Sequence, residues 1–178
     1  MDAIVQKAMI KWPNVPNCFG WLGLDARGNW YLRDAAAQAC GGFASGVPGA
    51  KGALLRHEGW IAFIGRNYEA DEHGAWYFQN GPQRVFVELE ATPWIWRIQP
   101  DGSIVAHTGK RTTLSRDWTD EAGRVFLSTD LGFGLVHTQD VADAADAIEQ
   151  GRWPAPLRID SREIPARFGF IANPQARH

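Results

Sequence analysis

The sequence predicts one α+β domain: a mainly antiparallel β-meander or barrel-like sheet with two or three packed helices. Residues 75–107 alternate apolar and polar side chains between turn signals, and residues 139–150 carry apolar side chains at helical spacing. A chain of 178 residues is long enough to bury one core without disulfides or metals. We therefore expect residues 1–178 to form a single domain, with two β-rich halves, about 1–107 and 108–178, as the alternative.

The strand signal is clearest between residues 75 and 107. The aromatic run 75–79 meets Asn80-Gly81, a dipeptide that favours a two-residue hairpin turn. Residues 84–90 alternate again, and Pro100-Asp101-Gly102 supplies a further turn. The stretch is predicted to be a three- or four-strand antiparallel meander.

Three turns share the pattern Asp-x-x-Gly, followed by large apolar residues, and begin at Asp25, Asp71 and Asp120. Asp accepts hydrogen bonds from its own turn, and Gly supplies the positive φ that closes it. The first of these turns predicts a hairpin over residues 19–33. Recurring hairpin chemistry explains the pattern, and duplication of a β-rich unit is the alternative.

Helices are predicted over residues 2–10, 53–68 and 139–150, the last with Thr138 as its N-cap. A strand over residues 60–64 is the alternative to the second helix. Between the first hairpin and that helix, the glycine-rich segment 34–52 is interpreted as a mobile surface loop with one or two helical turns at 35–39. Residues 157–159 and 167–171 are expected to add edge strands.

Composition excludes several classes of function. The net charge of −2 argues against a nucleic-acid partner, and no apolar stretch approaches the ~20 residues of a membrane span. The N-terminus lacks the basic and apolar regions of a secretory signal, so Cys18 and Cys40 are expected to be reduced thiols in the cytoplasm.

Catalytic chemistry has no complete motif in this sequence. His57, His73, His107, His137 and His178 form no metal-binding frame, so no metal and no cofactor are expected. An enzyme would need residues that meet only in the fold. The candidates for such a site are His57, His73, His137 and Asp140, with Asp71 and Arg66 beside them.

Two short segments dense in amides, arginines and aromatics indicate a ligand site. They contribute six candidate ligand-binding residues: Arg66, Asn67, Tyr68, Gln79, Asn80 and Arg84. Converging at one end of the sheet, these would form a polar-rimmed aromatic pocket, whereas the alternative is hydrogen bonding between loops.

The preferred hypothesis is a non-enzymatic small-ligand or protein binding module, or a regulatory one, with an aromatic-lined cleft, and the nine Trp residues suit this use. A homodimer through exposed strands or Trp residues belongs to the same hypothesis. An enzyme with a His/Asp site is the alternative.

Four segments resemble an uncharacterised family of small proteobacterial proteins, a domain of unknown function. They are residues 12–16 (WPNVP), 20–25 (GWLGLD), 78–85 (FQNGPQRV) and 131–137 (LGFGLVH). The resemblance implies a small bacterial cytoplasmic protein and assigns no activity and no site residue.

Overall fold

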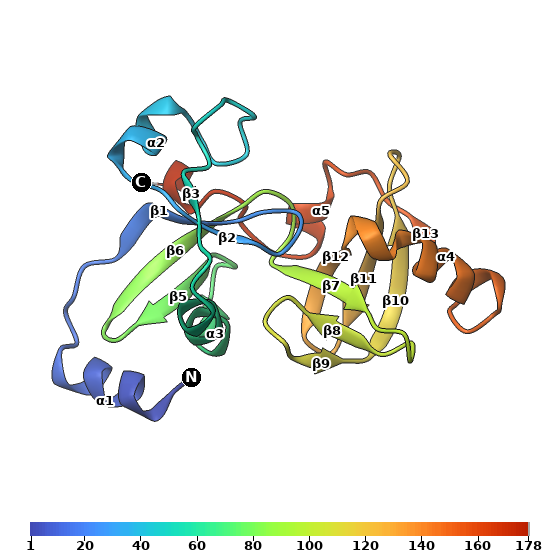
Figure 1. Ribbon diagram of the computed structural model, residues 1–178, viewed down its shortest axis with the longest axis horizontal. Coiled ribbons are helices and arrows are strands. Elements are labelled where there is room, and N and C mark those ends of the chain that lie inside the picture. Colours follow the sequence, from blue (N-terminus) through green and yellow to red (C-terminus); the bar gives the residue numbers. More distant parts are fainter. Residues whose placement is uncertain (178) are drawn as a thin grey trace. The chain divides into compact units, whose positions relative to one another are not determined.

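The computed structural model describes residues 1–177 and confirms the α+β class (Figure 1). In this part of the chain, five α-helices accompany two mixed, mostly antiparallel sheets, one of which is a half-barrel. The chain divides into two compact units. Unit 1 comprises residues 1–25, 29–90 and the segment from Phe170 onward, and unit 2 comprises residues 26–28 and 91–169. Each unit has its own sheet, and the expectation of a single domain stays a prediction.

Unit 1 is built on a six-stranded sheet with the order β3-β2-β1-β6-β5-β4. Neighbouring strands are antiparallel except β1 and β6, which run parallel. The strands are β1 (Cys18–Leu24), β2 (Trp30–Leu32), β3 (Ala53–Leu54), β4 (Tyr68–Ala70), β5 (Trp76–Asn80) and β6 (Gln83–Leu89). On one face of this sheet, Ala75, Tyr77 and Phe86 form a buried apolar cluster.

The helices of unit 1 are α1 (Ala3–Lys11), α2 (Ala35–Cys40) and α3 (Glu58–Arg66), with a 3-10 helix, η2, at Pro174–Arg177. The helices predicted over residues 2–10 and 53–68 are confirmed as α1 and α3, although α3 is shorter than the predicted range. Residues 53–54 pair as β3, and Tyr68 begins β4. Residues 60–64 lie within α3, so the alternative of a strand there is wrong.

Unit 2 is built on a seven-stranded sheet with the order β13-β10-β11-β12-β7-β8-β9. Its strands are β7 (Trp94–Ile98), β8 (Ile104–Ala106), β9 (Arg111–Thr112), β10 (Leu114–Thr119), β11 (Val125–Thr129), β12 (Gly132–Val136) and β13 (Leu157–Arg158). Its helices are the 3-10 helix η1 (Thr138–Asp140), α4 (Val141–Glu149) and α5 (Ile164–Arg167).

The predicted meander over residues 75–107 is divided between the two sheets. The hairpins β5–β6 and β7–β8 are confirmed as antiparallel pairs. However, β6 also pairs in parallel with β1, and β7 with β12. The chain changes sheets near Thr92-Pro93, where the alternation breaks. A period of two identifies a strand but carries no information about a distant partner, so the continuous meander was wrong there.

The Asp-x-x-Gly turns confirm the expected hairpin chemistry. In each, one carboxylate oxygen accepts a 2.8 Å hydrogen bond from the backbone N–H four residues later. The three turns join β1 to β2, β4 to β5 and β10 to β11. Duplication of a larger unit stays a prediction.

Three local expectations need correction. The interpretation of segment 34–52 as a surface loop is wrong at Phe43 and Ala50, which are buried. Thr138 is not an N-cap: His137 caps the 3-10 helix η1, where its Nδ1 accepts a hydrogen bond from the Gln139 N–H, and Asp140 stands at the N-cap of α4. The expected strand over residues 167–171 is reduced to one parallel β-bridge, between Ile171 and Ala75, because α5 extends to Arg167. A short apolar run does not by itself decide between helix and strand, so tertiary packing decides here.

No helix in residues 1–177 is long and apolar enough to cross a membrane.

Candidate functional site

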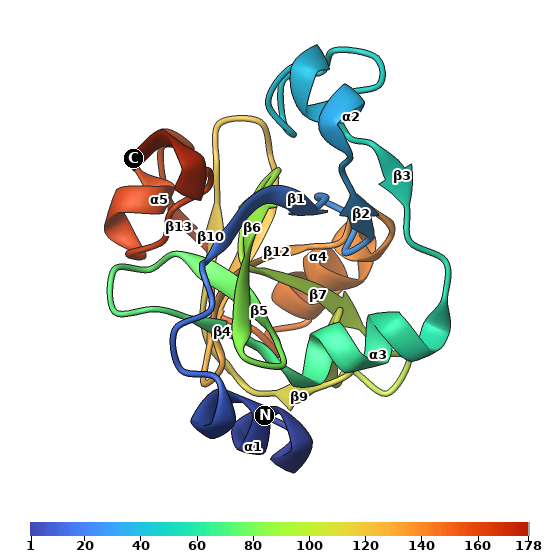
Figure 2. The ribbon, with the colours of Figure 1, turned by 90° about the vertical axis from the view of Figure 1, so that its left-hand side faces the viewer.

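Unit 1 contains an open cavity of about 1020 Å³. Cys18, Leu22, Phe78 and Val85 line it from β1, β5 and β6. The rest of its lining comes mainly from the segment that runs from α2 through β3 to α3, which can be followed in Figure 2. The cavity therefore lies between strands of the sheet and one continuous piece of chain.

A glycine allows that piece of chain to approach the sheet closely. Gly52 has a φ of +76°, and a Cβ atom at this position would lie 2.3 Å from the Leu32 carbonyl oxygen of β2. Any side chain would therefore push the segment away from β2 and change the outline of the cavity.

Large apolar side chains around the cavity are unusually exposed. Trp21 is 48% exposed, Leu32 50% and Trp60 52%, and all three line the cavity. A single exposed apolar residue is ordinary, whereas several around one concave site are typical of a ligand-binding surface. Of the nine Trp residues, four are buried and serve as core, namely Trp30, Trp94, Trp96 and Trp118.

Few polar groups interrupt the apolar lining. His57 is the N-cap of α3, and its Nδ1 accepts a 3.2 Å hydrogen bond from the Trp60 N–H. Asp34 caps α2 in the same way, accepting from the Ala37 N–H at 2.8 Å. Partial burial raises the pKa of the Cys18 thiol, which keeps it protonated and a poor nucleophile.

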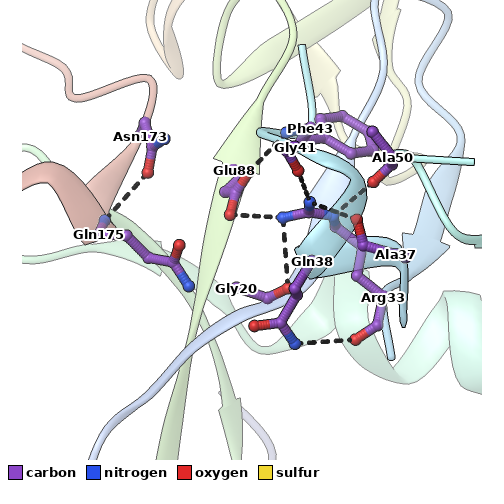
Figure 3. Close-up of polar contacts among 10 residues, drawn as sticks. All are labelled: Gly20, Arg33, Ala37, Gln38, Gly41, Phe43, Ala50, Glu88, Asn173 and Gln175. Carbon is purple, nitrogen blue, oxygen red and sulfur yellow. Dashed lines mark hydrogen bonds and ion pairs between the residues drawn. The ribbon is translucent and has the colours of Figure 1, made fainter. Parts of the chain in front are cut away.

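A buried ion pair attaches segment 34–52 to the sheet (Figure 3). Arg33, only 2% exposed, lies 2.7 Å from the Glu88 carboxylate of β6. The other Glu88 oxygen accepts a 2.9 Å hydrogen bond from the Phe43 N–H. The guanidinium also donates to the carbonyl oxygens of Gly20, Ala37, Gly41 and Ala50. The pair therefore fixes α2 and the loop after it, which form one wall of the cavity.

Neither Arg33 nor Glu88 was among the residues predicted from the sequence. Residues 84–90 alternate, and Glu88 falls on the polar side of this pattern with Arg84 and Glu90, which predicts a solvent-exposed carboxylate. A carboxylate in such a strand is buried only with a partner, but that partner is 55 residues away in the sequence.

Of the six predicted ligand-binding residues, Asn80 lines the cavity. Arg66 instead forms an ion pair with Asp2 at 3.2 Å. The buried Asn67 accepts from the Asp2 N–H at 2.7 Å and donates to the Phe63 carbonyl at 2.9 Å. These contacts fasten the start of α1 to the end of α3.

The remaining three also have structural contacts. Tyr68 is buried with its ring edge-on to Trp30, and burial raises its pKa. Gln79 is buried and donates to the Gly81 carbonyl at 2.9 Å. The Arg84 guanidinium lies 4.7 Å from the centre of the Tyr77 ring. A role of these residues in ligand binding stays a prediction.

The candidate catalytic residues are distributed over both units. In unit 1, His57 lines the cavity, whereas His73 lies on the exposed turn that Asp71 opens, 3.4 Å from Glu72. His137 belongs to unit 2, as does Asp140, and His178 lies outside the described residues. Within residues 1–177, no three His, Cys, Asp or Glu side chains form a group able to hold a metal ion.

Asp140 has a structural partner. Burial tends to raise the pKa of this carboxyl, but hydrogen bonds from Arg97, the nearer at 2.6 Å, and from the Ile98 N–H at 3.0 Å hold it below its usual 3.8. The carboxylate is therefore ionised at neutral pH and attaches the start of α4 to β7. Its role in catalysis stays a prediction.

Comparisons with curated proteins and solved structures assign no activity to the chain. No curated protein matches the chain. A DUF1285 family protein from Silicibacter pomeroyi DSS-3 is similar in structure, with 12% sequence identity, a TM-score of 0.48, and coverage of 82% of this chain and 84% of that one. A DUF1285 family protein from Shewanella baltica OS155 has 12% identity, a TM-score of 0.47, and coverage of 71% and 91%.

One family model covers nearly the whole sequence. Residues 1–175 match the model described as "Protein of unknown function (DUF2946)". This match confirms the resemblance to an uncharacterised family that the four sequence segments indicated. The chain therefore belongs to the DUF2946 family of proteins of unknown function.

Proposed function

We propose that the protein is a non-enzymatic binding module that holds a small apolar molecule in the cavity of unit 1. The observation that carries this proposal is the exposure of Trp21, Leu32 and Trp60 around one concave site of about 1020 Å³. Ligand sites commonly have volumes of about 300–1,000 Å³ and mostly apolar walls with a few polar groups.

The driving force would be removal of apolar surface from water, worth about 25 cal/mol per Å². For drug-sized ligands, binding yields about 0.3 kcal/mol per non-hydrogen atom. A ligand of about 20 such atoms would then bind with about 6 kcal/mol, which corresponds to a Kd of tens of micromolar. The wall formed by α2 and the loop after it is held in place before binding by the Arg33–Glu88 pair, so little ordering of this segment would oppose binding.

The test uses N-phenyl-1-naphthylamine, an uncharged apolar probe whose fluorescence rises when it leaves water. The probe has about 17 non-hydrogen atoms, so the full chain is expected to bind it with about 5 kcal/mol, which corresponds to a Kd of about 0.2 mM. Trp60→Ala removes part of the wall and should weaken binding at least several-fold. Because Trp60 is half exposed, the variant should keep the wild-type circular dichroism spectrum.

Trp12 provides the matched control. It is 51% exposed, close to the value for Trp60, but lies at the end of α1 and does not line the cavity. Trp12→Ala should leave probe affinity unchanged. The proposal fails if the wild-type chain does not bind the probe, or if Trp12→Ala weakens binding as much as Trp60→Ala.

A further inference from the structure

We propose that the ligand is a carboxylate-headed amphiphile whose head is bound by His57 and whose apolar body lies along the cavity wall beside Trp60. This inference rests on the proposed function, because it specifies the ligand of the same cavity. It depends on three features of the rim: the tautomer of His57, the start of α3, and the position of Asp34.

The capping contact of His57 determines which ring nitrogen carries the proton. Nδ1 accepts the hydrogen bond from the Trp60 N–H, so the neutral imidazole carries its proton on Nε2. In the described part of the chain, Nε2 has no hydrogen-bond partner. His57 is exposed and lines the cavity, so Nε2–H is available to donate to a ligand oxygen.

The start of α3 carries partial positive charge, which attracts a negatively charged ligand head. The helix has nine residues, and its aligned peptide dipoles place partial positive charge at the His57 end. That charge favours an anionic oxygen over a neutral hydroxyl. Glu58 in the first turn opposes the effect, but its side chain is exposed and screened by water.

The other charged groups of the lining favour one orientation of the ligand. Arg33 is neutralised by Glu88, so its guanidinium is not available to a ligand carboxylate. Of the described lining residues, Asp34 alone is an acid, and it lies at the start of α2. Like charges repel, so a ligand carboxylate is disfavoured at α2 and favoured at α3. The apolar residues between these two places then cover the ligand body.

The experiment measures displacement of N-phenyl-1-naphthylamine by three ligands with the same ten-carbon chain: decanoate, 1-decanol and decylammonium. Each is used below its solubility or micelle limit. A hydrogen bond to a charged group contributes enough for about a ten-fold difference in affinity. Decanoate should therefore displace the probe at about ten-fold lower concentration than 1-decanol, and decylammonium should not compete better than decanoate.

His57→Asn is the diagnostic variant. Asn is a good N-cap and keeps α3 intact, but it replaces the imidazole that carries the Nε2–H donor. The advantage of decanoate should disappear in this variant, while affinities for 1-decanol and the probe stay within two-fold of wild type. A carboxylate advantage that survives His57→Asn, equal affinity of decanoate and 1-decanol, or strongest binding of decylammonium would overturn the inference. Each of these leaves the apolar cavity site intact, whereas failure of the probe itself to bind overturns both proposals.

Discussion

Replacement of Glu88 by Gln should cost the protein about 3 kcal/mol of unfolding free energy. The carboxylate accepts from Arg33 at 2.7 Å and from the Phe43 N–H at 2.9 Å. Gln has nearly the same shape but only one acceptor oxygen, so one of the two donors would face an NH2 group. The buried guanidinium would also lose the only opposite charge that it contacts among the described residues.

The magnitude follows from two opposing effects. Breaking a buried ion pair by removing one partner typically costs about 3–5 kcal/mol. Arg33 keeps hydrogen bonds to backbone carbonyls, among them that of Ala50 at 2.8 Å, which offset part of the cost. We therefore expect a value near the lower end. For a chain of this size, it corresponds to a fall in Tm of about 6–12 °C.

The assay is urea unfolding at neutral pH, followed by Trp fluorescence and circular dichroism. Glu90→Gln is the matched control: Glu90 pairs with Lys51 at 2.7 Å, but both side chains are about one-third exposed. Partly exposed pairs contribute about 0–1 kcal/mol, so this variant should stay within about 1 kcal/mol of wild type. The double variant Arg33→Met/Glu88→Leu should recover part of the loss, because it buries no charge. A loss in Glu88→Gln no larger than that in Glu90→Gln would refute the reasoning.

Two further predictions concern unit 2. Asp117 is fully buried, neither of its oxygens has a hydrogen-bond partner among the described residues, and burial raises the pKa of its carboxyl above 3.8. Because the Asp117 carboxyl then ionises at lower pH in the unfolded chain than in the folded one, Asp117 lowers the stability of the fold progressively above about pH 4. Asp117→Asn should therefore raise Tm at pH 7 by more than at pH 3. An equal change in Tm at both pH values would contradict this. Gly134→Ala would place a Cβ atom 2.5 Å from the Trp94 carbonyl oxygen, so it should lower the unfolding free energy by about 1–3 kcal/mol in urea titration. Gly42→Ala, where the space is open, is its control and should be neutral or slightly stabilising; equal losses in the two variants would contradict the steric argument.

The local elements of the fold were largely predictable. The helix at residues 139–150, the hairpin at 19–33 and the turn at Asn80-Gly81 are all present. Each depends on side-chain period or turn chemistry within about ten residues, which a sequence displays directly. The α3 helix formed despite Gly59 and Gly65 in its interior, because an apolar stripe that can be buried outweighs local propensity.

The candidate site was much less predictable. The segments 66–68 and 79–84 carry the residue types of a pocket, yet most of those side chains fasten neighbouring elements to one another. The cavity instead draws on Trp21, His57 and Trp60, which come from β1, the cap of α3 and α3 itself. His57 falls inside the predicted helix 53–68, whereas the observed helix starts at Glu58, so the capping role of His57 emerged only with the structure.

The sequence by itself determined where strands, helices and Asp-Gly turns form, because dihedral preferences and apolar periods act between near neighbours. Only the tertiary structure decided that β1 pairs with β6 and β7 with β12, and that Arg33 meets Glu88 across 55 residues. The physical reason is that burial, strand pairing and the shape of a cavity depend on which distant segments come together. That choice minimises the free energy of the whole chain and leaves no local pattern in the sequence.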